Sequence, residues 1–254
     1  MMLLRTWLTL ARHPETASAA TDEARRIIHA DALALEARVR SRGIRLHAVD
    51  DPAWFRDKIE KEAERLRAVG AELPLLSAHA DLLTRHLTAE NFLAIVATKS
   101  RRLLPMPLLA TGTISTYPRS TPRELLATQR LYCDYPDVDA PYKAVVVEGD
   151  DPALDEADSY AHGGTLWVRE FDQNNGLGGM LARLVVAIAW LRFGRTVIGT
   201  IVAGKRHEDL MSVPRVIGRA LCDGLDTRIC MFRLADILAA AERTDRRPVD
   251  IAAT

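Results

Sequence analysis

A glycine-rich corner between a short apolar strand and a long apolar helix is the part of this chain most suited to chemistry. The strand is predicted over Thr165–Val168 and the helix over Met180–Phe193, with Gly176 and Gly178 in the corner. The first turn of a helix has backbone N–H groups without intrahelical partners, and the helix dipole adds partial positive charge there. Glycines allow positive φ and keep side chains away from an approaching ligand. These features predict an anion site suited to a pyrophosphate.

Two common phosphate-binding motifs do not fit this corner. The dinucleotide pattern Gly-x-Gly-x-x-Gly needs a third glycine and follows the first strand of a βαβ unit, but Leu181 stands at that position and the corner lies well past the middle of the chain. A P-loop ends in Gly-Lys-Ser/Thr, which Gly178-Gly179-Met180 does not supply. A glycine-rich turn that binds nothing remains an alternative.

The corner resembles the coenzyme A site of the GNAT-type N-acyltransferases, whose pattern is Gln/Arg-x-x-Gly-x-Gly/Ala. Gln173, Gly176 and Gly178 match this pattern in order. Val168 lies five residues before Gln173, where the family ends its fourth strand with an aliphatic residue. The helix is followed by an apolar strand over Thr196–Ala203, and we expect this strand to be the parallel neighbour of Thr165–Val168.

The resemblance implies acetyl-CoA, or another acyl-CoA, as co-substrate. The pantetheine arm is expected along the edge of the motif strand, with the pyrophosphate on the backbone N–H groups of the corner. The thioester then lies in the middle of the sheet, where an amine attacks it. The implied coenzyme-binding residues are Trp167, Val168, Gln173, Asn174, Asn175, Gly176, Leu177, Gly178 and Gly179.

Acylation of an amine needs a general base, because the attacking nitrogen must be neutral. In several members of the family this base is a carboxylate six residues before the position of Val168, and His162 stands there in this chain. An unperturbed imidazole has a pKa of about 6.5, which suits base catalysis near neutrality. The alternative for His162 is a surface histidine in a Gly-Gly turn. Glu148 is a second candidate if its strand joins the sheet.

The departing thiolate needs an acid, for which the family often uses a tyrosine in the helix after the fifth strand. A helix is predicted over Ser212–Cys222, with a serine cap and a proline in its first turn, but it contains no tyrosine. Cys222 stands near the expected place, and a thiol of pKa about 8.5 can protonate a thiolate. A lone cysteine is otherwise a small buried hydrophobe. His207 and Glu208 lack a third ligand at metal spacing, so no metal is predicted.

The composition excludes some classes of partner. The 254 residues contain 34 basic and 34 acidic side chains, so no global charge draws the chain to nucleic acid or to an anionic membrane. Three scattered cysteines argue against a disulfide framework. The apolar N-terminal stretch has no basic region before it, and the run Leu184–Leu191 is far shorter than the ~20 residues of a membrane helix. We therefore expect a cytoplasmic protein.

The order of predicted elements is that of a GNAT fold, an α/β (α+β) class with a mixed, mostly antiparallel sheet flanked by helices. Residues 1–72 are expected to form extra N-terminal helices packed on the core, 73–240 the acyltransferase domain and 241–254 a flexible tail. Ile44–Val49 is the best candidate for the first strand. Further strands are predicted at 92–97, 108–114, 142–148 and 226–234, and further helices at 21–43, 51–70, 75–87, 122–131 and 235–243.

The function that the resemblance implies is acyl-CoA-dependent N-acyl transfer, with an acetyl group passing directly to an amine under general-base assistance. The expected partner is a small-molecule or peptide amine, without nucleic acid or membrane, and a homodimer stays open. One alternative is a degenerate domain that binds coenzyme A or a partner protein without catalysis, which the missing tyrosine favours. A dinucleotide-binding oxidoreductase is the other alternative, and the missing third glycine disfavours it.

Overall fold

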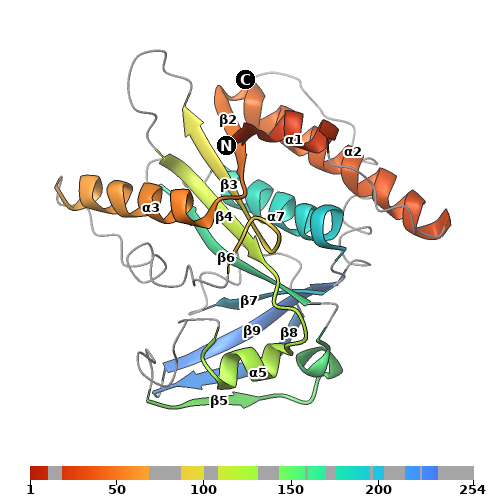
Figure 1. Cartoon of the computed structure of the whole chain (residues 1–254), viewed down its shortest axis with the longest axis vertical. Coiled ribbons are helices and arrows are strands. Elements are labelled where there is room, and N and C mark those ends of the chain that lie inside the picture. Colours follow the sequence, from red (N-terminus) through yellow and green to blue (C-terminus); the bar gives the residue numbers. More distant parts are fainter. Residues whose placement is uncertain are drawn as a thin grey trace.

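One sheet organises the molecule (Figure 1). The computed structural model describes residues 1–10, 19–68, 87–99, 108–130, 143–157, 160–169, 175–194, 197–202, 215–223 and 225–233. Their strands form a nine-stranded sheet in the order β1-β2-β3-β4-β6-β7-β9-β8-β5. β6 and β7 run parallel, and the other described neighbours are antiparallel. The predicted class, a mixed and mostly antiparallel sheet flanked by helices, is confirmed.

Most predicted elements appear close to their predicted bounds. The strands are β1 (Met2–Leu3), β2 (Ile44–Val49), β3 (Phe92–Lys99), β4 (Leu108–Ser115), β5 (Val145–Glu148), β6 (Tyr160–Val168), β7 (Val197–Val202), β8 (Arg215–Cys222) and β9 (Leu225–Arg233). The helices are α1 (Leu4–Leu10), α2 (Ala19–Ser41), α3 (Pro52–Arg67), α5 (Pro122–Ala127), the 3-10 helix η1 (Pro152–Asp155) and α7 (Leu177–Phe193). The predicted helix at 235–243 and the tail lie outside the described residues, as does the helix at 75–87 except for its last residue.

The predicted helix over Ser212–Cys222 is wrong for the residues that the structure describes, because Arg215–Cys222 is strand β8. β8 pairs with β9 on one side and β5 on the other. The register of β8 shifts between Val216 and Gly218. As a result the buried residues are Ile217, Ala220 and Cys222, and burial does not alternate strictly along the strand. That broken alternation mimics the spacing of an amphipathic helix in the sequence.

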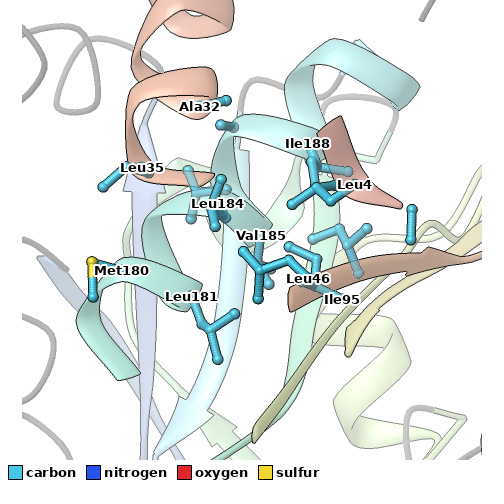
Figure 2. Packing of buried hydrophobic residues seen from close by; sticks show 14 of the residues in the cluster. Leu4, Ala32, Leu35, Leu46, Ile95, Met180, Leu181, Leu184, Val185 and Ile188 are labelled. Atoms are coloured by element: carbon cyan, nitrogen blue, oxygen red, sulfur yellow. The ribbon is translucent and has the colours of Figure 1, made fainter. Parts of the chain in front are cut away.

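Helix α7 is the centre of the larger apolar cluster. Its side chains pack between α2 and the sheet, and Figure 2 shows Leu184 and Val185 of α7 near Leu46 of β2. α7 is apolar around its whole circumference, which a helix covered on both sides requires. Gly112 of β4 lets α7 approach closely, since a Cβ there would lie 2.7 Å from Val185 Cγ2. The corner that opens α7 is thereby held against the sheet.

A second apolar cluster covers the opposite face of the sheet. It joins α3, α5 and η1 to the strands, and the rings of Phe55 and Phe92 lie 5.8 Å apart within it. Tyr160 and Trp167 of β6 belong to this cluster, whereas Ala161 of β6 belongs to the α7 cluster. Figure 1 shows α3 on one side of β3 and β4, with α2 and α7 on the other.

The long connection between β4 and β6 crosses to the far end of the sheet. It contains α5, β5 and η1, and β5 forms the edge beside β8. Arg123 of α5 ties it together, donating to the Asp155 carboxylate at 2.8 Å and to the Gly149 carbonyl at 2.8 Å. The Asp223 carboxylate accepts from the backbone N–H groups of Lys143 and Ala144, and these bonds lower the pKa of Asp223. The segment is therefore anchored away from the β6 corner.

His47 of β2 makes the stability of the fold pH-dependent. Burial, the neighbouring Arg45 charge and the N-terminal ammonium lower the pKa of His47, and its Nε2 lies 3.2 Å from Thr98 Oγ1. Below a pH of about 6.5 the unfolded chain takes up a proton that the folded ring resists, so stability should fall as the pH falls.

We expect His47→Gln to flatten this dependence by at most about 1.4 kcal/mol per pH unit, the one-proton limit. Glutamine is uncharged and can still bond Thr98. Urea unfolding between pH 5 and 8 measures the slope for both proteins. Equal slopes would mean that another group carries the acid sensitivity.

Candidate functional site

Strands β6 and β7 pair only over a short stretch and then separate. Their parallel register joins Tyr160 to Val197, Ala161 to Ile198 and His162 to Gly199. Beyond that point β6 continues to Val168 against β4, while β7 continues against β9, with no further pair between β6 and β7 among the described residues. His162 is thus the last paired residue of β6 before the strands diverge. The pairing confirms that β6 and β7 are the parallel neighbours predicted from the sequence. We call the part of the sheet beyond His162, where these two strands no longer pair, the opening.

A β-bulge interrupts β6 inside this opening. Gly164 pairs with Thr113 and Trp167 pairs with Thr111, so two residues of β6 stand opposite one residue of β4. The extra residue reverses the alternation of side chains along the strand. Tyr160 and Trp167 therefore lie on the same face although their positions differ by seven, an odd number. It also removes one backbone pair to β4 beside the opening.

Helix α7 begins directly after β6, with Gly176 as its N-cap at φ 77°. A residue with a side chain there would adopt the left-handed region at a cost of roughly 1–2 kcal/mol. Asn175 Oδ1 accepts the backbone N–H of Leu177 at 3.0 Å, and Met180 N–H donates to the Gly176 carbonyl at 3.1 Å. The Arg42 guanidinium, from the turn after α2, donates to the Asn175 carbonyl. These contacts shape the start of α7 and tie it to the turn after α2.

The N-terminus of α7 has room for an anion. Among the residues that the structure describes, and apart from the corner's own adjoining backbone, no atom lies within 4 Å of a Cβ built on Gly176 or on Gly179, and a Cβ on Gly178 meets Val168 Cγ2 at 3.4 Å. The N–H groups of a first helical turn point out of the helix end and favour negative charge. The predicted residues Gln173 and Asn174 lie outside the described residues.

The backbone of β6 presents Val168, more than Trp167, to the opening. Arg169 N–H donates to the Leu109 carbonyl at 2.8 Å, so this pair of residues bonds across the β4–β6 ladder. Along an antiparallel ladder, residue pairs whose backbone N–H and C=O groups bond to each other alternate with pairs whose backbone groups point away from the partner strand. Trp167 opposite Thr111 therefore directs its backbone groups to β4, whereas those of Val168 point to the β7 side. Of the two predicted pantetheine contacts, Val168 has the required direction.

His162 lies at the point of divergence, and its ring contacts Tyr160. The hydroxyl of Tyr160 is 3.1 Å from His162 Nδ1. A Cβ on Gly164 would lie 3.4 Å from His162 Nε2 and 3.3 Å from Thr113 Oγ1, so Nε2 lies beside Gly164. Gly164 belongs to the part of β6 that has already left β7. The half-buried imidazole thus has Nδ1 toward Tyr160 and Nε2 toward the opening.

The structure does not bring the other two predicted catalytic residues to this point. β5 does join the sheet, but Glu148 lies on its far edge, exposed and opposite Arg219. Four strand spacings separate β5 from β6, or roughly 19 Å at the usual ~4.8 Å each. Cys222 lies on β8, buried in the cluster around Leu154. The helix that suggested Cys222 is a strand, so the reason for assigning it as the acid is lost.

Two residues of this site are missed by the sequence patterns. Tyr160 is a buried strand residue whose partner His162 follows two positions later, and only that spacing on one strand face could have indicated the pair. Arg42 lies more than one hundred residues before the corner, and no local pattern connects the two. Among the side chains that the structure describes, no group of three or more His, Cys, Asp or Glu could hold a metal ion. No helix within the described ranges is both long and apolar enough to cross a membrane.

Comparisons with known proteins give structural similarity alone. No protein-family model matches the sequence, and no curated protein does. NAA60 from Arabidopsis thaliana, in complex with acetyl-CoA, aligns with 76% of this chain and 99% of its own at 13% identity and a TM-score of 0.46. The spermidine/spermine N-acetyltransferase SpeG from Vibrio cholerae aligns with 78% of this chain and 98% of its own at 10% identity and a TM-score of 0.44.

A third similar structure is AAC(6')-Ib in complex with acetyl-CoA, which aligns with 82% of this chain and 99% of its own at 14% identity and a TM-score of 0.42. Identities and TM-scores this low do not transfer an activity to this chain. The likeness to a GNAT fold therefore rests on the strand order and on the parallel pair that diverges at His162.

Proposed function

We propose that this chain is an acyl-CoA-dependent N-acyltransferase. The observation that carries the proposal is that three features follow one another. β6 stops pairing with β7 after His162, and the backbone groups of Val168 further along β6 point to the β7 side. The glycine corner that begins α7 then lies next to Val168, at Gly178. An extended thiol-bearing arm with a pyrophosphate at one end fits this sequence of features. The arm would pair with the β6 edge and the pyrophosphate would accept from the first-turn N–H groups of α7.

The coenzyme direction follows from this arrangement. With the pyrophosphate at Gly178, the arm runs back along β6 from Val168 toward His162. The thioester would then lie near Gly164, where the β-bulge has interrupted the pairing to β4. A backbone N–H released from a ladder can donate to the thioester oxygen as negative charge develops on it. The acyl carbon would thus lie in the diverged part of the sheet.

The proposed chemistry is direct attack by an amine. His162 Nε2 takes a proton from the acceptor nitrogen, the new C–N bond forms as the C–S bond breaks, and the coenzyme leaves as a thiolate that must be protonated. His162 is the described side chain with a titratable nitrogen at the point where the strands diverge. The acid for the thiolate is left to water, because neither Glu148 nor Cys222 lies at the opening.

A ligand panel with a turnover assay tests the function. Isothermal titration and thermal shift would be measured with acetyl-CoA, desulfo-CoA, NAD and NADP. A ligand at 100 times its Kd adds about 2.7 kcal/mol of stability, so a binder is readily detected. Turnover would be followed by release of free thiol with a polyamine, an aminoglycoside and a peptide with a free amino terminus.

The outcomes separate the alternatives. Binding of acetyl-CoA with thiol release that depends on an amine supports the proposal. Coenzyme binding without turnover on any amine would favour a domain that binds coenzyme A and does not catalyse. Binding of NAD or NADP with no affinity for acetyl-CoA would overturn the proposal in favour of a dinucleotide site.

A further inference from the structure

Tyr160 and His162 form a hydrogen-bonded pair on one face of β6, where Tyr160 belongs to the second apolar cluster. Both side chains project to the same face of β6, and the Tyr160 hydroxyl lies 3.1 Å from His162 Nδ1. Tyr160 is 3% exposed, so its hydroxyl has little access to water. Gly164, two residues beyond His162, lies beside the imidazole, since a Cβ there would be 3.4 Å from His162 Nε2. The pair therefore orients the ring along β6, from the buried end toward the opening.

The direction of this hydrogen bond decides what His162 can do. A neutral imidazole has one N–H and one lone pair, and the partner of one nitrogen sets the state of the other. If Tyr160 donated to Nδ1, then Nε2 would carry the proton and could not accept another. If Tyr160 accepts from Nδ1–H, then Nε2 is free of a proton. Only the second arrangement permits His162 to act as a base toward the opening.

We propose that Tyr160 is a positioning residue that accepts the Nδ1–H of His162 and so holds the unprotonated Nε2 beside Gly164, at the opening of the sheet. This inference rests on the proposed acyl transfer, in which the acceptor N–H bond breaks and an Nε2–H bond forms. The Nδ1–H bond to Tyr160 is the same before and after that step. The arrangement therefore favours the imidazolium form without any rearrangement of the pair.

The surroundings keep Tyr160 in the required neutral form. Burial, and to a smaller extent the nearby Tyr117, raise the pKa of Tyr160, so the phenol stays protonated throughout the working range of pH. On β4, Thr113 and Ser115 pair with Gly164 and His162, and on β7, Gly199 pairs with His162. None of these three residues has a side chain that gains or loses a proton near neutral pH. Tyr117 is a further titratable group near Tyr160, and it too is buried.

The tautomer of His162 can be measured without turnover. Protein labelled with 15N-histidine would be titrated by two-bond 1H–15N correlation NMR, and the His162 signals among the seven histidines would be identified by their loss in His162→Gln. We expect the neutral ring to carry its proton on Nδ1. A ring with its proton on Nε2 would overturn the inference, because Tyr160 would then be the donor.

Tyr160→Phe removes the hydroxyl and keeps the ring that fills the cluster. We expect the His162 pKa and the acid limb of the kcat profile to move down together by roughly 0.5 to 1 pH unit, the equivalent of one net hydrogen bond. The value of kcat should fall about 3- to 10-fold, while KM for acetyl-CoA stays near wild type. Tyr117→Phe is the matched control, since it removes a buried hydroxyl near Tyr160 and leaves the Tyr160–His162 pair in place, and it should keep the wild-type acid limb.

Different results would overturn the positioning role of Tyr160 and the proposed acyl transfer. An active wild-type protein whose acid limb is the same in Tyr160→Phe, or moves equally in Tyr117→Phe, would overturn the role of Tyr160 and leave acyl transfer standing. A wild-type protein that neither binds acetyl-CoA in calorimetry nor releases thiol would overturn acyl transfer itself, and the positioning role with it.

Discussion

Replacing His162 by alanine should lower the turnover of acetyl-CoA about 10²- to 10⁴-fold, the usual contribution of a general base. The reason is its position: it is the last residue of β6 paired with β7, and its Nε2 lies beside Gly164 in the diverged part of the strand. Coenzyme affinity should remain near the wild-type value, because the imidazole faces the reacting end and not the pyrophosphate. Steady-state kinetics between pH 6 and 9, with calorimetry for coenzyme A, measures both quantities.

The acid limb of the rate profile should disappear together with the activity. His162→Gln controls for the loss of side-chain volume and of the hydrogen bond in the alanine variant. Glutamine can still bond Tyr160, but it cannot take up a proton at neutral pH. Its turnover should be as low as that of the alanine variant. Added imidazole should restore part of the activity of His162→Ala, where the deleted ring leaves space. Full activity in either variant across this pH range would assign base catalysis to water.

Replacing Gly178 by valine should weaken coenzyme A binding roughly 10- to 100-fold, as expected for losing one hydrogen bond to a charged group. A Cβ at this position meets Val168 Cγ2 at 3.4 Å, an ordinary contact, so the fold should survive. The added γ-methyl groups, however, would occupy the space that a phosphate needs to reach the first-turn N–H groups of α7. Calorimetry with coenzyme A, and a melting curve for each variant, provide the measurement.

Gly178→Ala is the matched control for this position. It adds only the Cβ for which the structure has room, and it should bind within a few-fold of wild type. Alanine also favours a helix by about 1 kcal/mol over glycine, so its melting temperature should not fall. Unchanged affinity in the valine variant would show that the corner is a turn and that the ligand, if any, binds elsewhere.

The sequence by itself determined the elements around the corner, because the signals there are local. The glycine pattern predicted the start of α7, and Gly176 has the positive φ that only glycine adopts without cost. Runs of β-branched and apolar residues predicted β3, β4 and β7, which are central strands of the sheet. The family resemblance predicted that β6 and β7 are parallel neighbours, and their pairing up to His162 confirms it.

Only the tertiary structure decided which residues share the opening, because that depends on register and on pairing between distant segments. The bulge between Gly164 and Trp167 sets which side chains of β6 face each cluster, and a one-residue change of register is invisible in a sequence pattern. The register shift in β8 likewise gave a strand the residue spacing that predicted a helix from the sequence. Glu148 ends a strand that the sequence predicted, yet the pairing of that strand with β8 places it at the far edge of the sheet. The hydrogen bond between Tyr160 and His162 likewise requires both side chains on one face, which the folded β6 strand provides.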